Sequence, residues 1–162
     1  MADQDLTGKT ILITGATAGI GLAAAAELAG RGATLAVVGH HPEKDQKIFA
    51  DMIETTGSAL IAYFEADLAV QADVRRLAEQ VRSSYDHLDA LINNVGGFFM
   101  ERKTTVDGFE MTFALNHLNV LLLTYLLLDM LKAGAPSRIV NVASDEHRRG
   151  KIDFANLQGQ RN

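Results

Sequence analysis

The chain opens with a strand, a glycine turn and a helix in direct succession, and this order restricts the fold more than any other feature. Residues 10–14 are apolar and β-branched, which is typical of a buried strand. The alanine-rich residues 22–28 favour a helix. Between them, Gly15, Gly19 and Gly21 let the backbone turn sharply and approach a ligand without Cβ atoms in the way. Because a helix N-terminus presents unpaired N–H groups to that turn, we predict a phosphate site there.

The glycines alone do not establish a nucleotide site. Glycine is common in turns that bind nothing, so an ordinary structural turn is the alternative. The order strand, turn, helix is the context that a dinucleotide site requires. We therefore predict a nucleotide cofactor at the start of the chain.

Length and composition are those of one folded domain. The chain has 162 residues, of which 48% are hydrophobic and 22% charged, and we predict a single domain over residues 1–162. The net charge of −5 argues against a nucleic-acid partner. The chain has no cysteine, so disulfides and thiolate metal ligands are excluded, and we expect no metal site.

Targeting signals are not evident in the sequence. The N-terminal residues 1–5 are short and acidic, unlike a signal peptide, so we expect a cytoplasmic protein. The apolar run 118–128 is well short of the ~20 residues of a membrane span. We interpret it as part of a buried helix.

Short apolar runs alternate with helical segments along the whole chain. The predicted strands are residues 10–14, 34–38, 59–64, 90–93 and 138–142. After the first helix, the predicted helices are residues 43–56, 70–82 and 107–132. Such alternation predicts an α/β fold, a Rossmann-type doubly wound parallel sheet with helices on both faces. Ligands bind such sheets at the carboxyl ends of the strands, where the strand order reverses.

The glycine turn and four later segments resemble the short-chain dehydrogenase/reductase family. Residues 14–21 resemble its Thr-Gly-x-x-x-Gly-x-Gly signature. The later segments are Asp67-Leu68, Asn93-Asn94-Val95-Gly96, the helix around Asn116, and the strand that leads to Ser144. Residues 145–158 are similar to the retinol-dehydrogenase-like branch. The resemblance runs from about Leu6 to Asn162 and implies the N-terminal part of a Rossmann domain, about five strands, incomplete at the C-terminus.

The resemblance implies a set of cofactor-binding residues. They are Gly15, Thr17, Ala18, Gly19, Ile20, Gly21, His40, Asp67, Leu68, Asn94, Val95 and Gly96. Asp67 would accept a hydrogen bond from the adenine amine, although a helix-capping or loop aspartate is the alternative. Val95 replaces the alanine usual in the family.

Two residues are implied in catalysis. Asn116 would hold a water of the proton relay, and Ser144 would donate a hydrogen bond to the substrate oxygen. An asparagine within an apolar helix is poorly explained by helix propensity, so we expect Asn116 to be buried with a polar partner. Ser144 alone would be read as a turn residue.

The end of the second predicted strand decides between the two nicotinamide cofactors. A carboxylate there accepts hydrogen bonds from the ribose hydroxyls and repels a 2′-phosphate. This chain has Gly39-His40-His41 and no carboxylate at that point. We therefore favour NADP(H), with NAD(H) as the alternative.

The family's Tyr-x-x-x-Lys motif does not occur in this sequence. Tyr63, Tyr85 and Tyr125 are each followed, four positions on, by aspartate. The expected function is an NAD(P)-dependent oxidoreductase that interconverts a small alcohol and a carbonyl, inactive as this truncated chain. The alternatives are a non-catalytic nucleotide-binding module or truncated pseudoenzyme, and an interaction fragment. We expect the helix near residues 121–128 to expose an apolar patch that favours homo-oligomers.

Overall fold

The computed structural model describes residues 5–161. Residues 1–4, where we expect no signal peptide, and residue 162, at the end of the predicted domain, lie outside the described residues. The strands are β1 (Thr10–Thr14), β2 (Thr34–Gly39), β3 (Ile61–Glu65), β4 (Ala90–Asn93) and β5 (Arg138–Asn141). The helices are α1 (Gly19–Gly30), α2 (Pro42–Thr56), α3 (Gln71–Ser84), α4 (Met111–Phe113), α5 (Asn119–Leu126) and α6 (Leu128–Ala133).

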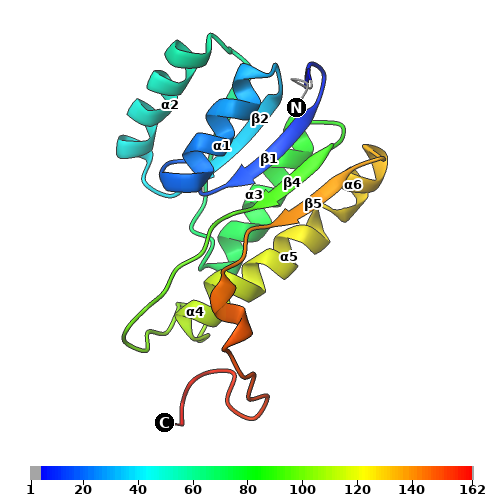
Figure 1. Ribbon diagram of the computed structural model, residues 1–162. Coiled ribbons are helices and arrows are strands. Elements are labelled where there is room, and N and C mark those ends of the chain that lie inside the picture. The colour runs from blue at the N-terminus through cyan, green and yellow to red at the C-terminus, as the bar shows by residue number, and fades with distance from the viewer. Residues whose placement is uncertain (1–4, 162) are drawn as a thin grey trace.

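The strands form one parallel sheet in the order β3-β2-β1-β4-β5 (Figure 1). In sequence order the chain first builds outward from β1 to β3, then returns to pair β4 with the other side of β1. This reversal between β1 and β4 confirms the predicted doubly wound Rossmann-type fold. Because all strands are parallel, their carboxyl ends meet at one edge, where the glycine turn lies.

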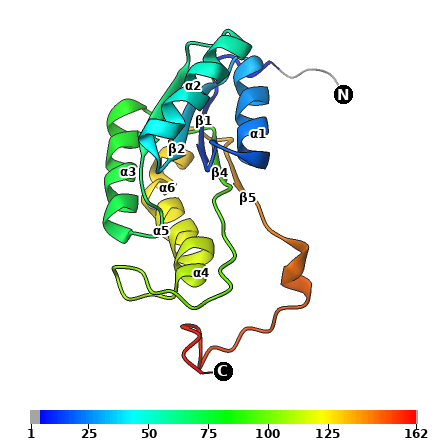
Figure 2. The same ribbon diagram turned by 90° about the vertical axis from the view of Figure 1, so that its left-hand side faces the viewer.

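Alternate residues of β1 pack into two separate apolar layers, one on each face of the sheet. Leu12 packs with buried residues of α3, α5 and α6, and Ile11 and Ile13 pack with those of α1 and α2. Figure 2 shows α1 and α3 on opposite sides of the sheet. All three β1 residues are at most 5% exposed, so the strand that leads into the glycine turn is fixed by both layers.

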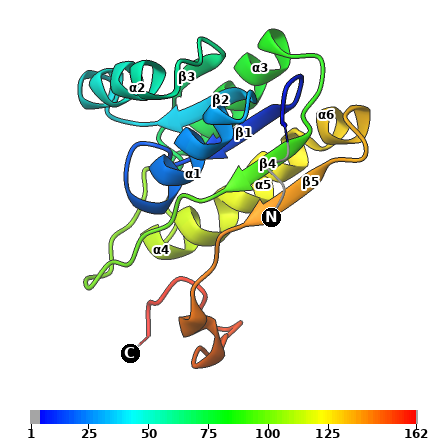
Figure 3. The same cartoon turned by 45° about the horizontal axis from the view of Figure 1, so that its top comes forward.

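The edge strand β5 is much less covered than β1. Each of its residues is exposed, with Ile139 at 44% and Val140 at 46%. Figure 3 shows β5 at the sheet edge away from α1 and α2. After β5, the part of the chain that the structure describes, up to residue 161, contains one short 3₁₀ helix, η2 (Asp145–Arg148).

The predicted long helix over about residues 107–132 begins later, at Met111, extends to Ala133 and is irregular along its length. Residues before Met111 form a turn in which Gly108 has a φ of 83° and Thr104 pairs with Glu110. Glu110 then caps α4, because its carboxylate accepts hydrogen bonds from the N–H groups of Thr112 and Phe113 at 2.9 and 2.8 Å.

After α4 the helix is irregular at two places, a π-helical segment and a break. A π-helical segment, η1 (Ala114–Leu118), leads into α5, and a break at Leu127 separates α5 from α6. The side chain of Asn119 donates a hydrogen bond to the Leu115 carbonyl oxygen, a local bond of the kind that disturbs regular helices. Within residues 5–161, no helix has the length and apolar character needed to cross a bilayer.

Candidate cofactor site

A cleft of about 490 Å³ lies at the carboxyl edge of the sheet. The predicted cofactor residues that line it are Gly15, Thr17, Ala18, His40, Asp67, Leu68, Asn94, Val95 and Gly96. Gly19, Ile20 and Gly21 do not line it, and the Ile20 side chain is 74% exposed. Apolar side chains that the sequence analysis did not single out close one end of the cleft: Phe99, Met111 and Leu115.

Two glycines of the turn are required by close packing. A Cβ on Gly21 would lie 2.2 Å from the carbonyl oxygen of Gly15 and 2.4 Å from Nδ2 of Asn94. Gly15 has a φ of 69°, and a Cβ there would lie 2.8 Å from Cγ2 of Val95. The turn therefore packs directly against the segment that follows β4, with room for no side chain at either glycine.

The first turn of α1 faces this turn without a side-chain cap. The residue before the helix is Ala18, which makes no capping hydrogen bond. A helix N-terminus that lacks a capping side chain leaves N–H donors for an anion, and the helix dipole favours negative charge there. The residues present therefore fit a cofactor pyrophosphate.

Thr14 ties the glycine turn to the end of β4. Its side chain is buried, and its Oγ1 accepts hydrogen bonds from the N–H groups of Asn94 and Val95, at 3.0 and 3.1 Å. In return, Nδ2 of Asn94 donates to the carbonyl oxygens of Thr14 and Gly15, at 3.0 and 3.1 Å. The sequence analysis did not give Thr14 a role in the site, although its place just before Gly15 is the signal that could have done so.

The end of β2 carries two histidines and, behind them, a carboxylate. The ring centroids of His40 and His41 are 3.8 Å apart, and His40 lines the cleft. Asp45 of α2 is only 1% exposed, and its Oδ2 accepts hydrogen bonds from His41 N–H and from the Tyr63 hydroxyl, each at 3.0 Å. A Cβ on Gly39 would lie 2.2 Å from this oxygen. Thus β2 ends without a carboxylate of its own, but the following helix supplies one.

Asp67 lies in the loop after β3. Its Oδ1 accepts a hydrogen bond from Ala69 N–H at 2.9 Å, and its own N–H donates to Asp73 Oδ2 at 3.1 Å. The hydrogen bond from Asp67 N–H lowers the pKa of Asp73. Burial acts in the opposite direction, and the hydrogen bond and charge of Arg76 lower this pKa further. Asp67 is exposed on the cleft wall, so its position suits both an adenine contact and the loop role.

Asn116 lies in the π-helical segment η1 and is exposed, where we expected a buried side chain. Its Nδ2 donates to the Gly97 carbonyl oxygen and its Oδ1 accepts from Gly97 N–H, both at 2.8 Å. The buried asparagine of this helix is Asn119, at 4% exposure. Asn116 therefore holds the segment after β4, and π-helical turns of this kind are frequent at functional sites.

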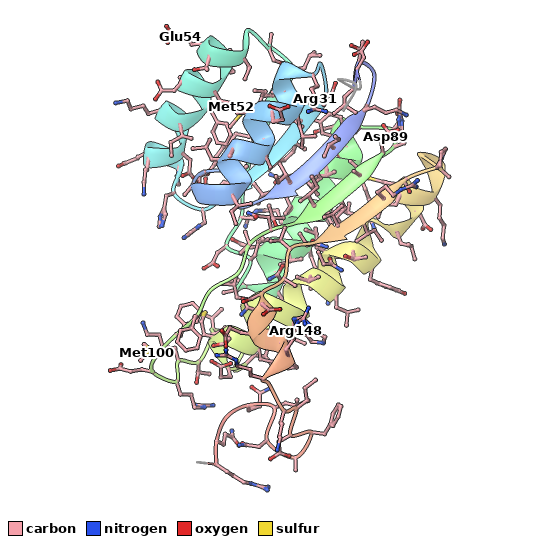
Figure 4. The ribbon with its side chains drawn as sticks, viewed as in Figure 1. Arg31, Met52, Glu54, Asp89, Met100 and Arg148 are labelled. Carbon is pink, nitrogen blue, oxygen red and sulfur yellow. The ribbon has the colours of Figure 1, made fainter. Side chains whose placement is uncertain are left out.

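Ser144 follows β5 at the same sheet edge but does not line the cleft. The end of β5 is held beside β4 by a hydrogen bond from Val142 N–H to the Asn93 carbonyl oxygen, at 2.9 Å. Oγ of Ser144 accepts a hydrogen bond from Glu146 N–H at 3.3 Å and so caps η2. Figure 4 shows Arg148 of η2 and Met100 of the β4–α4 loop at one end of the molecule, and Asp89 at the other end of the strands.

Two of the tyrosines lie in surroundings that oppose ionisation. Burial, the hydrogen bond to Asp45 and the negative charge of Asp45 all raise the pKa of Tyr63. Burial alone raises the pKa of Tyr85. A tyrosine that transfers protons near neutral pH needs the opposite shift, which a neighbouring cation provides.

Comparisons with known proteins agree with this geometry. Human retinol dehydrogenase 11 is 42% identical over 156 residues, which are 96% of this chain and 49% of the relative. The Pseudomonas aeruginosa RhlG/NADP active-site complex superposes with a TM-score of 0.76 at 28% identity, over 96% of this chain and 62% of that one. The NADH-dependent reductase A1-R′ gives a TM-score of 0.77 at 32% identity, over 95% of this chain and 65% of that one.

The chain spans about half the length of the curated relatives it matches. The family model described as short chain dehydrogenase matches residues 9–156, which include the glycine turn, the cleft, Asn116 and Ser144. This 162-residue chain belongs to the short chain dehydrogenase family.

Proposed function

We propose that the cleft binds a nicotinamide dinucleotide and that the site serves an NAD(P)-dependent oxidoreductase. The observation that carries the proposal is the turn from Gly15 to Gly21, which has no room for a side chain at either glycine and faces the uncapped start of α1. This arrangement suits the pyrophosphate, and His40 and Asp67 stand where the adenosine half would lie. The nicotinamide half would lie toward Gly96 and the apolar end of the cleft.

The reaction we propose is the interconversion of a small alcohol and a carbonyl compound. The bound cofactor supplies or accepts the hydride. Ser144 is proposed to donate its hydroxyl proton in a hydrogen bond to the substrate oxygen, which favours negative charge developing on that oxygen. Asn116 is proposed to fix Gly97 and to hold a water of the proton relay, as the family resemblance implies.

The 162-residue polypeptide itself is proposed to bind the cofactor without turnover. No tyrosine in it is followed four positions later by lysine, and the pKa values of Tyr63 and Tyr85 are raised. A non-catalytic nucleotide-binding module is therefore the second candidate function. Measurable carbonyl reduction by the purified polypeptide would refute the proposed inactivity.

NADP(H) is the cofactor we favour. His40 lines the cleft at the end of β2, where an imidazolium can donate to a 2′-phosphate. The RhlG structure is a complex with NADP, which supports this choice, and A1-R′ is NADH-dependent, which keeps NAD(H) as the alternative.

A fluorescence titration of the polypeptide with NADPH and NADH tests cofactor binding directly. We expect saturable binding of both, tighter for NADPH. Absence of binding of either cofactor at millimolar concentration would remove the proposed function.

We also propose that the chain self-associates through α5. Its residues Leu121 and Tyr125 are 60% and 73% exposed, and they border an apolar groove of about 320 Å³. Sedimentation velocity of the wild type and of Leu121→Glu tests this. A wild type that stays monomeric at all concentrations would exclude the association.

A further inference from the structure

The carboxylate behind the end of β2 is the feature of the molecule that the proposed reaction leaves unexplained. From its position we infer that Asp45 determines how strongly this site prefers NADPH over NADH, by opposing the 2′-phosphate. This inference rests on the proposed cofactor site. It concerns a residue that does not line the cleft and so does not touch the cofactor itself.

Asp45 is held directly behind the cleft wall. Gly39 and His40 line the cleft, and the Asp45 Oδ2 atom occupies the space that a side chain at residue 39 would need, 2.2 Å from the ideal Cβ position. The N–H of Asp45 donates to the His41 carbonyl oxygen at 2.8 Å, while His41 N–H donates back to Asp45 Oδ2 at 3.0 Å. Two hydrogen bonds therefore tie the carboxylate of Asp45 to the loop that carries the histidines.

The carboxylate acts through its charge, because it is not free to bind the ribose. It is 1% exposed, and Oδ2 is already the acceptor for His41 N–H and the Tyr63 hydroxyl. The ring of Tyr63 packs on Phe49, with centroids 4.9 Å apart, and this contact secures the donor. A buried charge is screened less than an exposed one, so its field reaches the cleft beside Gly39.

The consequence differs between the two cofactors. A 2′-phosphate placed near His40 is repelled by the Asp45 charge, whereas a ribose hydroxyl is neutral and unaffected. Other charged side chains at the start of α2, Glu43 and Lys44, border a separate surface depression with His41 and Pro42. His40 can donate a hydrogen bond to the phosphate and the charge of Asp45 opposes its binding, so the site accepts both cofactors with only a modest preference.

The test removes the charge and keeps the shape. In Asp45→Asn the amide oxygen can still accept from His41 N–H and the Tyr63 hydroxyl. Titrations of wild type and variant with NADPH and NADH are run at the same pH and ionic strength, so that the substitution at Asp45 is the difference in charge between the two proteins. We expect NADPH affinity to rise about five- to tenfold and NADH affinity to change less than about twofold.

Two further variants make the result decisive. Asp45→Ser also removes the charge and leaves the space beside Gly39 open, so it should shift the ratio of affinities in the same direction. Tyr63→Phe removes a hydrogen bond and keeps the charge, so it should lower the melting temperature and leave the ratio unchanged. Circular dichroism establishes that each variant is folded.

The possible outcomes separate this inference from the proposed function. If the wild type binds neither cofactor, the proposed function fails. If it binds both and the folded charge-free variants keep the wild-type ratio, the role of Asp45 is overturned and the cofactor site stands. A ratio that shifts equally in Tyr63→Phe would assign the effect to loop position rather than to charge, and would also overturn the inference.

Discussion

The cofactor half and the catalytic half of the proposed active site are held in place by different kinds of contact. The cofactor half lies on β1, β2 and β4, where Leu12 and Ile13 have no exposed surface and Thr14 is 1% exposed. The proposed catalytic half includes Ser144, which follows the exposed strand β5 and whose side chain accepts a local hydrogen bond from Glu146 N–H. The first half is held in place by buried packing. The second half lies on exposed segments that are held by hydrogen bonds, such as those between Asn116 and Gly97 and from Val142 N–H to the Asn93 carbonyl oxygen.

This difference predicts which substitutions should reduce both the stability of the fold and the affinity for the cofactor. A change in the glycine turn disturbs atoms that also support the sheet, so stability and cofactor affinity should fall together. A change at Ser144 should leave both intact, because nothing buried depends on it. The following experiments test this contrast in order of decreasing effect.

Gly21→Val should have the largest effect. The new Cβ would lie 2.2 Å from the Gly15 carbonyl oxygen, so the turn has to move away from β4. We expect a destabilisation of about 1–3 kcal/mol, the range for overpacking, and loss of NADPH binding in the fluorescence titration. Gly30→Ala is the matched control in the same helix, because an added Cβ there meets nothing within 4 Å. Gly30→Ala should be neutral or should stabilise the fold by up to about 1 kcal/mol. Normal NADPH binding by Gly21→Val would disprove the packing argument.

Thr14→Val keeps the shape of a buried side chain and removes an acceptor. The N–H groups of Asn94 and Val95 lose their shared partner, Oγ1 of Thr14. We expect a loss of about 1–3 kcal/mol, the cost of unsatisfied buried donors, together with weaker NADPH binding. Urea unfolding measures the first effect, and amide exchange should be faster at Asn94 and Val95. Unchanged exchange there would mean that Thr14 does not hold β4 to the turn.

Asp89→Asn should reduce the stability of the fold without reducing cofactor affinity, because Asp89 lies at the end of the strands opposite the cleft (Figure 4). Burial raises the pKa of Asp89, but the hydrogen bonds from Lys9 and from Thr10 N–H, each 2.8 Å, hold it below its ordinary value. A group with a lowered folded pKa stabilises above its unfolded pKa of about 3.9 and loses that contribution as the pH falls through the folded pKa.

The Asp89→Asn variant should therefore be about 1–2 kcal/mol less stable than wild type at pH 7 and nearly equal to it at about pH 2. Urea unfolding at both pH values measures the difference. An equal difference at the two pH values would show that the charge of Asp89 is not the cause.

Ser144→Ala should have the smallest effect. Its side chain is exposed and makes one hydrogen bond of 3.3 Å, so stability should change by less than about 0.5 kcal/mol and NADPH affinity should not change. Asn116→Ala is the useful contrast, because it removes two hydrogen bonds of 2.8 Å to Gly97 and should cost about 1 kcal/mol. If Ser144→Ala destabilised the chain as much as Thr14→Val, the division into two halves would be wrong.

The sequence predicted those features that depend on short-range patterns. The five strands and the apolar face of α3 follow from the spacing of apolar residues in the sequence, which does not depend on distant contacts. On α3 that face is formed by Val74, Leu77 and Val81. The start of this helix at Met111 and its irregular winding were not predicted, because the cap by Glu110 and the Asn119 side-chain bond act only once the backbone is placed.

The carboxylate behind β2 could not have been found from the sequence. Asp45 and Tyr63 are 18 positions apart, and their contact depends on how α2 packs against the sheet. The exposure of Asn116 has the same origin, since helical spacing does not say which face a π-helical segment turns to solvent. Both misses concern side chains whose surroundings are set by tertiary packing.

The order of the cleft along the chain has a consequence for biosynthesis. Every residue that lines the cleft lies at or before Leu115, and β5 begins only at Arg138. Because the ribosome makes the N-terminal end first, every residue of the lining has been synthesised before β5. A ligand that binds only the folded form stabilises it by mass action. Binding of the proposed dinucleotide would then favour the folded form of the chain as its synthesis is completed.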